Sequence, residues 1–279
     1  MSLTPILIDL ADYEYAGEGA NGASYNHKTD SSIMLKLYNA SAPMDIIVSE
    51  LECARKVYDA GIPTPLPGEF VTDGAGRYGI RFQRIVGKKS ISRAVGDEPQ
   101  RVEEYARLFA RMCRKLHATR LPEGQFPDIK ETNLRLLAED PFFTPEERER
   151  VAAFIQAAPD GNTAIHGDLQ FSNAIMAPDG KSYFIDLGDF ACGHPCFDLG
   201  MLLLCCCYDD DDFVRDVFHM EPATAREFWY WFVKEYFGED ADPDEWSRTL
   251  RPYAGLKVLI IERNLGIAFP QFHALLSEI

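Results

Sequence analysis

The sequence predicts an α+β protein in two parts, a small strand-rich part followed by a larger and mainly helical one. Alternating apolar residues mark two segments before Gly87, whereas helical periodicity dominates after it. Of the 279 residues, 46% are hydrophobic, so the chain can bury a large core and divide into two lobes. We therefore expect one domain over residues 1–87 and a second over residues 88–279.

The first part contains the strand predictions and one helix. In SIMLKLY, residues 32–38, every second side chain is aliphatic, which predicts a strand with Lys36 on the other face. Apolar residues recur at helical spacing from Pro43 to Ala60, and a glycine and a proline follow. Residues 78–85, YGIRFQRI, predict a further strand.

The second part reads mainly as helices. The segment from Glu98 to His117 is amphipathic, and Thr144-Pro145-Glu146-Glu147 is a capping box with proline at the first helical position. Two short apolar pieces, residues 174–176 and 182–185, flank the turn APDGK and predict a β-hairpin.

Charge and composition narrow the class of partner. The chain has 28 Lys and Arg against 44 Asp and Glu, a formal charge of −16, which repels nucleic-acid phosphates and anionic lipid. No apolar run approaches the roughly 20 residues that span a bilayer. Cys205, Cys206 and Cys207 lie in an apolar run, as buried reduced thiols do. We expect a cytoplasmic protein without nucleic-acid or membrane partners.

A polar run between two apolar pieces, TAIHGDLQFSNAIM at residues 163–176, is the strongest candidate site. Four residues separate Asp168 from Asn173, and the predicted hairpin returns the chain, so that Asp186 is expected near Asn173. Such oxygen ligands suit Mg²⁺ completed by water and phosphate. Singly, each residue is better explained by a capped loop. Together they favour a metal-binding and catalytic loop.

Two segments resemble a known family. HGDLQFSN is similar to the catalytic loop, and IDLGDFACGHPCFDLG to the metal-binding segment, of the aminoglycoside phosphotransferase and choline kinase family. These small-molecule kinases have a two-lobed protein-kinase-like fold, with a small antiparallel β-sheet and one helix in the N-lobe and a larger helical C-lobe. The resemblance covers residues from about Tyr13 to Leu204.

The resemblance implies roles for the residues of this loop. Asp168 is expected to act as catalytic base or to orient the acceptor hydroxyl, with His166 orienting the loop. Asn173 and Asp186 are expected to hold Mg²⁺ on ATP. Asp198 is expected to cap the next helix and to support the loop.

Near the N-terminus, GEGANG places Gly17, Gly19 and Gly22 in a G-x-G-x-x-G pattern, which dinucleotide-binding folds share. A dinucleotide fold needs a helix after the glycines, but a polar, turn-rich segment and a strand follow here. The pattern therefore favours a flap over phosphates. Glu18 departs from this expectation, because it places an acid in a loop that approaches anions.

The remaining nucleotide-binding residues follow from the two strands and the helix. Lys36 occupies the place of the family's phosphate-binding lysine. Glu50 lies on the apolar stripe of the predicted helix and needs a partner, whereas its rival Glu52 lies beside the stripe. We expect a Lys36–Glu50 pair. The backbones of Gln83 and Ile85 occupy the place where adenine is bound.

We therefore expect an enzyme that transfers phosphate from ATP to a hydroxyl of a small, positively charged molecule, such as an aminoglycoside, a choline-like compound or an amino alcohol. The acidic run Asp209–Asp212 favours a cationic acceptor, although a solvated loop explains it equally well. One alternative is a nucleotide-binding module without catalysis. Another is an atypical protein kinase, which Gly167 in place of arginine and the eleven residues between Asp186 and Asp198 disfavour.

Overall fold

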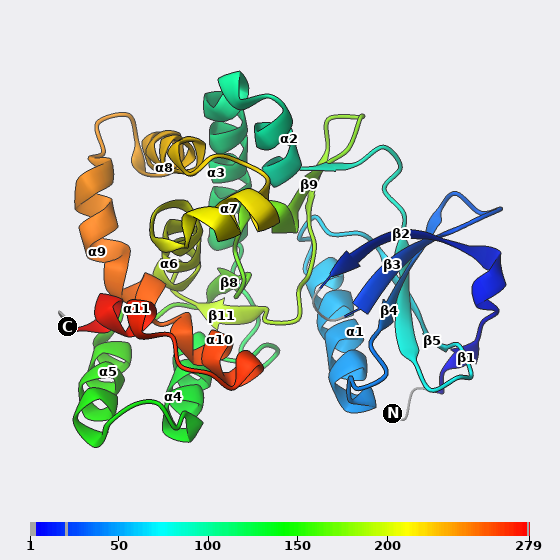
Figure 1. Ribbon diagram of the computed structural model, residues 1–279, viewed down its shortest axis with the longest axis horizontal. Helices are drawn as coiled ribbons and strands as arrows, with labels where there is room; N and C mark the ends of the chain where they lie inside the picture. Colours follow the sequence, from blue (N-terminus) through cyan, green and yellow to red (C-terminus); the bar gives the residue numbers. More distant parts are fainter. Residues whose placement is uncertain (1–3, 20–21, 278) are drawn as a thin grey trace. The chain divides into compact units, whose positions relative to one another are not determined.

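The computed structural model describes residues 4–19, 22–277 and 279, and they form two compact units (Figure 1). Unit 1 comprises Met1–Lys89 with Ile175–Gly188, and unit 2 comprises Ser90–Ala174 with Asp189–Ile279. The second segment of unit 1 is attached by its backbone, because Phe184 N–H donates to the Pro63 carbonyl at 2.8 Å. Asp186 thus belongs to the same unit as the predicted nucleotide-binding residues.

Unit 1 is built on a six-stranded sheet in the order β1-β5-β6-β4-β3-β2. The pairs β2–β3, β3–β4, β4–β6 and β5–β6 are antiparallel, and β1 adds a short parallel pairing to β5. The expected antiparallel sheet with one helix is therefore confirmed. The elements are β1 (Ile6–Leu7), η1 (Leu10–Asp12), β2 (Tyr13–Gly19), β3 (Gly22–His27), β4 (Ile33–Tyr38), α1 (Met44–Asp59), β5 (Pro67–Thr72) and β6 (Tyr78–Gln83).

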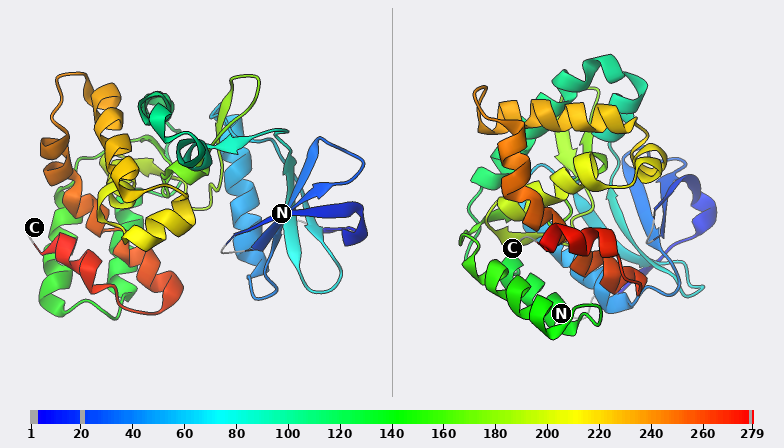
Figure 2. Two further views of the ribbon diagram at one scale, coloured as in Figure 1. Left: turned by 45° about the horizontal axis from the view of Figure 1, so that its top comes forward. Right: turned by 60° about the vertical axis from the view of Figure 1, so that its left-hand side comes forward.

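The alternation along β4 divides its side chains between the two faces of this sheet. Leu35 and Leu37 pack into an apolar cluster with Tyr13. Tyr38 packs on the opposite side with Ile47 of α1, the helix that lies against β5 and β6 (Figure 2). Because successive side chains of a strand point to opposite faces, Lys36 shares the α1 face with Tyr38.

Three short strands, β7 (Lys89–Ser90), β9 (Ala174–Met176) and β10 (Ser182–Phe184), pair in the order β10-β9-β7. The last two form the expected hairpin around APDGK, where Ala177 N–H donates to the Lys181 carbonyl at 2.8 Å. The turn at Gly180 has a φ of 82°, which glycine adopts without strain.

Unit 2 is mainly helical, with one small antiparallel sheet of β8 and β11. Thr144 forms the expected capping box at the start of α5. None of the helices in the described part of the chain is long and apolar enough to cross a membrane. The elements are α2 (Ile91–Asp97), η2 (Pro99–Arg101), α3 (Val102–Ala118), α4 (Ile129–Glu139), α5 (Pro145–Ala157), β8 (Thr163–Ile165), η3 (Phe171–Asn173), β11 (Ala191–Gly193), α6 (Cys196–Leu203), the π-helix η4 (Leu204–Tyr208), α7 (Asp211–Phe218), α8 (Pro222–Phe237), α9 (Pro243–Gly255), α10 (Val258–Leu265), α11 (Pro270–His273) and η5 (Ala274–Leu276).

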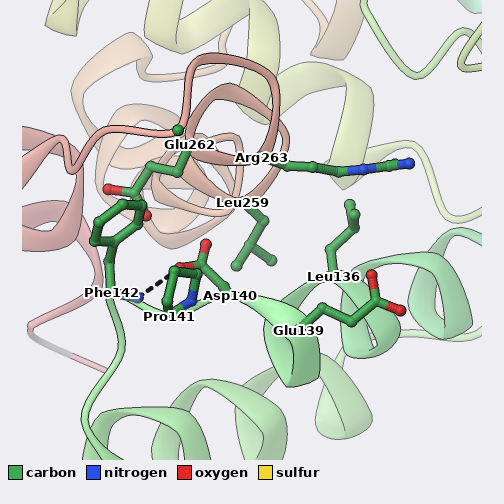
Figure 3. Close-up of a pocket in the computed structure, with 9 residues that line it drawn as sticks. Leu136, Glu139, Asp140, Pro141, Phe142, Leu259, Glu262 and Arg263 are labelled. Atoms are coloured by element: carbon green, nitrogen blue, oxygen red, sulfur yellow. Dashed lines mark hydrogen bonds between the residues drawn. The ribbon is translucent and has the colours of Figure 1, made fainter.

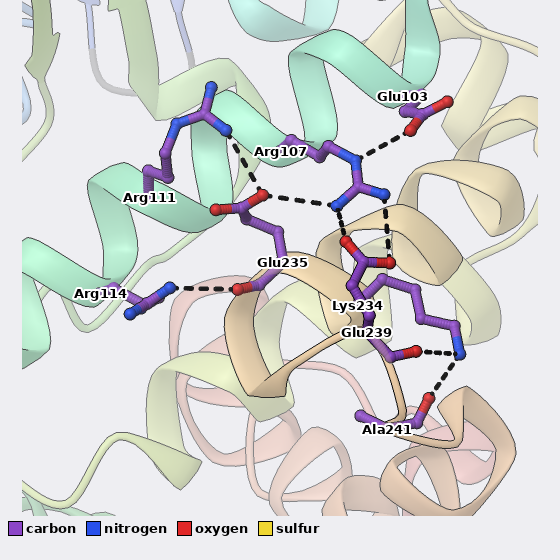
Figure 4. A network of polar contacts seen from close by, with 8 residues as sticks. All are labelled: Glu103, Arg107, Arg111, Arg114, Lys234, Glu235, Glu239 and Ala241. Atoms are coloured by element: carbon purple, nitrogen blue, oxygen red, sulfur yellow. Dashed lines mark hydrogen bonds and ion pairs between the residues drawn. The ribbon is translucent and has the colours of Figure 1, made fainter.

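The helices α3 and α8 pack along each other and fix the end of α3 that carries His117. Phe109 of α3 contacts the rings of Phe228 and Phe232, with centroids 6.0 Å apart in each case. Figure 4 shows the polar rim of the same interface, where Arg107 bridges glutamates of both elements. The participants are Glu103, Arg107, Arg111, Arg114, Lys234, Glu235, Glu239 and Ala241.

Candidate active site

In unit 1, Lys36 forms the ion pair with Glu50 that the sequence predicts. The Lys36 Nζ lies 2.7 Å from Glu50 Oε1, and the two side chains are 22% and 13% exposed. The rival Glu52 is exposed on α1. The pairing follows from the fold, because the alternation of β4 and the apolar stripe of α1 direct both side chains into the same layer.

A second carboxylate reaches the same ammonium. Asp186 Oδ1 lies 3.0 Å from Lys36 Nζ, although 150 residues separate the two in sequence. Burial alone would lower the pKa of Lys36, but the carboxylates of Asp186 and Glu50 raise it above its ordinary value. Lys36 is therefore held as a fixed cation within unit 1.

The backbone at Asp186 is in the left-handed region, with a φ of 61°. Non-glycine residues adopt it at a cost of order 1–3 kcal/mol, and such strain clusters at functional sites. The Asp186 side chain nevertheless stays half exposed. Asp186 therefore combines a strained backbone with a carboxylate that is open to solvent.

The three glycines lie where β2 and β3 meet. Gly19 pairs with Gly22, while Ala20 and Asn21, which connect them, lie outside the described residues. A Cβ added at Gly22 would overlap the Leu37 carbonyl oxygen, so packing requires glycine there. A Cβ at Gly17 would meet no described atom within 4 Å. Packing against the described residues thus leaves the choice of glycine at Gly17 unexplained.

At the end of β6, part of the predicted adenine-binding backbone is already used within the fold. Gln83 N–H donates to the Leu66 carbonyl at 2.8 Å, and Arg84 N–H donates to the Ser32 carbonyl at 2.7 Å. The Ile85 carbonyl accepts from Lys88 N–H at 3.4 Å. A contact from Gln83 to adenine would therefore go through its carbonyl group and not its N–H.

In unit 2, the loop after β8 fixes the carboxylate of Asp168 through its own residues. Asn173 Nδ2 donates to Asp168 Oδ2 at 2.8 Å and to the Asp168 carbonyl at 2.9 Å. Gln170 Nε2 also reaches Oδ2, at 3.1 Å, and Ser172 Oγ holds the other end of that amide. Asn173 is buried and Asp168 is partly exposed, so the loop presents one oriented carboxylate.

The Asp198 carboxylate supports this loop through hydrogen bonds and does not cap its own helix, α6. The N-cap of α6 is Pro195, and the expectation that Asp198 caps the helix is wrong. Its Oδ2 accepts from His166 N–H at 2.7 Å, and its Oδ1 accepts from Gly167 N–H at 2.9 Å. Asp198 is fully buried, and both of its oxygens accept hydrogen bonds from the two residues that follow β8.

Two further residues complete this support, and sequence reasoning did not assign either of them to it. His117 Nε2 lies 3.0 Å from Asp198 Oδ2, and its Nδ1 lies 2.7 Å from the Tyr236 hydroxyl. Burial alone would raise the pKa of Asp198, but its contacts with His117 and the backbone lower it. Lys257, between α9 and α10, donates to the carbonyl of Gly167. His117 had a weak signal as the last buried position of an amphipathic helix, whereas Lys257 had none.

The acidic run after η4 is partly structural. Asp210 caps α7 by accepting from Asp212 N–H at 2.9 Å and from Phe213 N–H at 3.2 Å, and Asp212 pairs with Arg215 at 2.9 Å. Asp209 differs from these two. Burial raises its pKa to about 7, against a smaller lowering by the Cys205 thiol. Helix capping explains the carboxylate of Asp210, and the ion pair with Arg215 explains that of Asp212.

A pocket of about 320 Å³ lies in unit 2 between α4 and α10 (Figure 3). Its walls include apolar side chains and two buried carboxylates, those of Asp140 and Glu262. Glu262 accepts from His273 Nε2 at 3.0 Å, and Asp140 Oδ1 accepts from Phe142 N–H at 2.8 Å. The full lining is Leu136, Glu139, Asp140, Pro141, Phe142, Leu259, Glu262, Arg263 and Gly266.

The fold defines the class of protein. Solved structures similar to this chain include the amicoumacin kinase hAmiN in complex with AMP-PNP, Ca²⁺ and Ami, at 16% identity and a TM-score of 0.56 over 98% of this chain and 88% of that one. Aminoglycoside phosphotransferase APH(3'')-Id from Streptomyces rimosus, in complex with ADP and streptomycin, has 20% identity and a TM-score of 0.54 over 88% and 99% of the two chains. A thermostable mutant of APH(4)-Ia in its apo form has 13% identity and a TM-score of 0.61 over 96% and 94%. The chain therefore has the kinase-like fold of these phosphotransferases.

The family follows from the sequence itself. A model of the phosphotransferase enzyme family matches residues 12–232, which is most of the chain. No sequence among curated proteins matches it. The chain belongs to the phosphotransferase enzyme family and is a small-molecule phosphotransferase.

Proposed function

We propose that the protein transfers the γ-phosphate of Mg-ATP to a hydroxyl of a small, positively charged molecule. The observation that carries the proposal is the fixed ammonium of Lys36, which lies 2.7 Å from Glu50 and 3.0 Å from Asp186. A charged lysine held by a helix glutamate is how kinases position ATP phosphates. The AMP-PNP bound in the hAmiN structure and the ADP bound in the APH(3'')-Id structure support the same donor.

On this proposal the hairpin of β2 and β3 covers the phosphates. Among the described residues, a Cβ added at Gly17 would meet no atom within 4 Å, and one added at Gly19 would meet only the Gly22 carbonyl oxygen, at 3.8 Å. Backbone N–H groups there could therefore approach anionic oxygens. Gly22 serves a different purpose, because it lets β3 approach β4. The backbone of Gln83, at the end of β6, and of Ile85, just after it, is assigned to adenine.

The residues assigned to the metal fit Mg²⁺ chemically. Both hydrogen bonds from the Asn173 amide to Asp168 leave from Nδ2, so its Oδ1 points away from Asp168 and is suited to a hard cation. Asp186 adds a half-exposed carboxylate on a strained backbone. Asn173 and Asp186 would hold Mg²⁺, which would supply positive charge to offset the negative charge that develops on the phosphate oxygens.

Asp168 is assigned to the acceptor. Both side-chain hydrogen bonds that it accepts from Asn173 and Gln170 reach Oδ2, which leaves Oδ1 as the oxygen directed to an acceptor hydroxyl. Asp168 would accept the hydroxyl proton or orient the hydroxyl for attack. His166 acts through its backbone, whose N–H Asp198 holds at 2.7 Å. It is therefore a positioning residue in this account.

The positive charge of the acceptor is the finer part of the proposal. The formal charge of −16 raises the local concentration of cations. With Asp210 and Asp212 used locally, Asp209 is the carboxylate of this run assigned to an amine. The hAmiN and APH(3'')-Id structures hold amicoumacin and streptomycin, which supports a small-molecule acceptor.

The test is a panel of amino alcohols, aminoglycosides and matched neutral alcohols, each incubated with Mg-ATP and assayed for ADP and phosphorylated product. We expect turnover with a cationic alcohol, and we expect Asp168→Asn to abolish it while ATP binding persists. Asp160→Asn, at an exposed carboxylate of the same unit, is the matched control and should retain full activity. If ATP binds but no acceptor is phosphorylated, a non-catalytic nucleotide-binding module becomes the better account. A preference for neutral alcohols at every ionic strength would remove the cationic acceptor.

A further inference from the structure

Lys257 contacts the candidate catalytic loop from outside the segment that the family model matches. It lies in the turn between α9 and α10, after residue 232, where that match ends. Its partly buried ammonium donates to the carbonyl oxygen of Gly167, which is 90 residues away in sequence. The contact therefore ties the last helices of unit 2 to the loop that carries Asp168.

The contact from Lys257 restrains the peptide bond directly before Asp168. Asp198 holds the N–H groups of His166 and Gly167, and thus the two peptide bonds before Gly167. Asn173 holds the carbonyl of Asp168, and thus the peptide bond after it. The peptide bond between Gly167 and Asp168 lies between these restrained peptide bonds. Its carbonyl is the group that Lys257 holds.

Gly167 is a residue at which such a restraint has a consequence. Its φ is 83°, in the left-handed region that glycine tolerates, and an added Cβ would overlap the carbonyl oxygen of Asp189. Glycine also has the widest conformational freedom of any residue, so the peptide bond after it needs an external contact to hold one orientation. Rotation of this peptide would turn the Asp168 Cα and redirect its carboxylate.

The positive charge of Lys257 also opposes the negative charges of Asp209 and Asp168 at the Cys205 thiol. Burial raises the pKa of the Cys205 thiol, the charges of Asp209 and Asp168 raise it further, and Lys257 lowers it. Lys257 and Asp168 therefore both act on one buried sulfur atom of η4. In this cluster Lys257 supplies the opposing positive charge.

An ordinary lysine contact elsewhere in the unit provides the comparison. Lys234 donates to the carbonyls of Glu239 and Ala241 at 2.8 and 2.9 Å, where it closes the end of its own helix α8 (Figure 4). Such contacts are common at helix C-termini and stabilise the helix. Lys257 lies at the start of α10 and reaches a distant loop instead.

We propose that Lys257 is a positioning residue, which fixes the peptide bond before Asp168 and so sets the direction of the Asp168 carboxylate. This inference rests on the proposed function of Asp168. On this inference the turn between α9 and α10 supports the loop that carries Asp168.

The test compares Lys257→Met, which keeps the length of the side chain but removes its charge and donors, with Lys234→Met as the matched control. The probe is ADP formation from Mg-ATP, with the acceptor found in the panel and with water. We expect Lys257→Met to lower kcat roughly 10- to 100-fold with little change in the KM for ATP, as for misplacement of a reacting group. Lys257→Arg should recover part of the loss, and methylammonium should partly rescue Lys257→Ala. Lys234→Met should lower the thermal midpoint and leave kcat unchanged.

Hydrogen exchange of the loop provides a readout that does not depend on activity. We expect faster exchange at residues 166–170 in Lys257→Met and normal exchange there in Lys234→Met. If the wild type transfers phosphate and Lys257→Met retains its kcat and its protection, the inference is wrong and the proposed function stands. If the wild type transfers no phosphate, the proposed function fails, and unchanged exchange in Lys257→Met would overturn the positioning role as well.

Discussion

Replacing Asp198 by asparagine should destabilise unit 2 strongly, because the carboxylate uses both of its oxygens. Oδ1 accepts from Gly167 N–H, while Oδ2 accepts from His166 N–H and contacts His117. Asparagine retains only one acceptor oxygen, so its amide group must face an N–H donor at one of these positions. Asp198 is fully buried, and water cannot replace the lost acceptor.

The magnitude follows from these contacts. One buried N–H left without an acceptor costs about 1–3 kcal/mol, and hydrogen bonds to a charged group contribute about 1.5–3 kcal/mol each. We therefore expect a loss of about 3–5 kcal/mol, the range observed when one partner of a buried charged pair is removed. This is a large share of the 5–15 kcal/mol that is typical of a whole domain.

The assay is urea unfolding followed by tryptophan fluorescence, which reports on unit 2 because all three tryptophans, Trp229, Trp231 and Trp246, belong to it. Asp128→Asn is the matched control. Its carboxylate also accepts two backbone N–H groups, but both reach Oδ1, which asparagine retains. A loss under 1 kcal/mol for Asp198→Asn, or equal losses for the two variants, would refute the reasoning.

The pH dependence of this loss has a defined sign. The pKa of Asp198 is lowered in the folded state, so its contribution to stability is complete above the ordinary value of 3.8 and is lost as the pH falls through the lower, folded value. The difference between wild type and Asp198→Asn should therefore stay constant from pH 8 to 5 and shrink below about pH 4.

Three further predictions concern single positions. Gly17→Ala should leave stability unchanged and raise the KM for ATP about tenfold, or 1.4 kcal/mol, whereas Gly22→Ala should unfold the hairpin. Steady-state kinetics and thermal melts distinguish these two effects. An unchanged KM in Gly17→Ala would remove Gly17 from the phosphate site. Glu50→Gln should lower kcat/KM for ATP roughly 10- to 100-fold through Lys36, and equal activity in Glu50→Gln and the exposed control Glu52→Gln would contradict the pairing. Asp209→Asn should stabilise the protein increasingly as the pH rises from 4 to 8. Burial raises the pKa of the Asp209 carboxyl to about 7, so its ionisation opposes folding. Thermal melts that show no gain in stability at pH 8 would contradict this prediction.

Local patterns were sufficient for those parts of the site that lie within one element or between two neighbouring elements. The alternation of residues 33–38 and the apolar stripe of α1 together led to the Lys36–Glu50 pair, since each pattern fixes the face on which a side chain lies. The same reasoning located the hairpin of β9 and β10 and the capping box at Thr144. The roles proposed for Gly17 and Asp186 remain predictions.

The contacts that sequence reasoning did not find join elements that are distant along the chain. His117 meets Asp198 across 81 residues and Lys257 meets Gly167 across 90, and no periodicity specifies such pairings. The helix α2 was also not identified, because its seven residues span only about two turns. In the sequence, the acidic run suggested a cation-binding surface. Asp210 is instead the N-cap of α7, a role that can be predicted only when the first residue of that helix is known.

The central claim is that this chain moves the γ-phosphate of Mg-ATP to a small acceptor through Asp168. Phosphorus NMR of the enzyme with Mg-ATP and a cationic alcohol from the panel tests it most directly, since it distinguishes ATP, ADP, inorganic phosphate and a phosphate monoester in one sample. We expect ADP and a new phosphate monoester in equal amounts with the wild type, and unchanged ATP with Asp168→Asn. Formation of the monoester at the same rate by Asp168→Asn, or release of inorganic phosphate alone by the wild type with every acceptor, would contradict it.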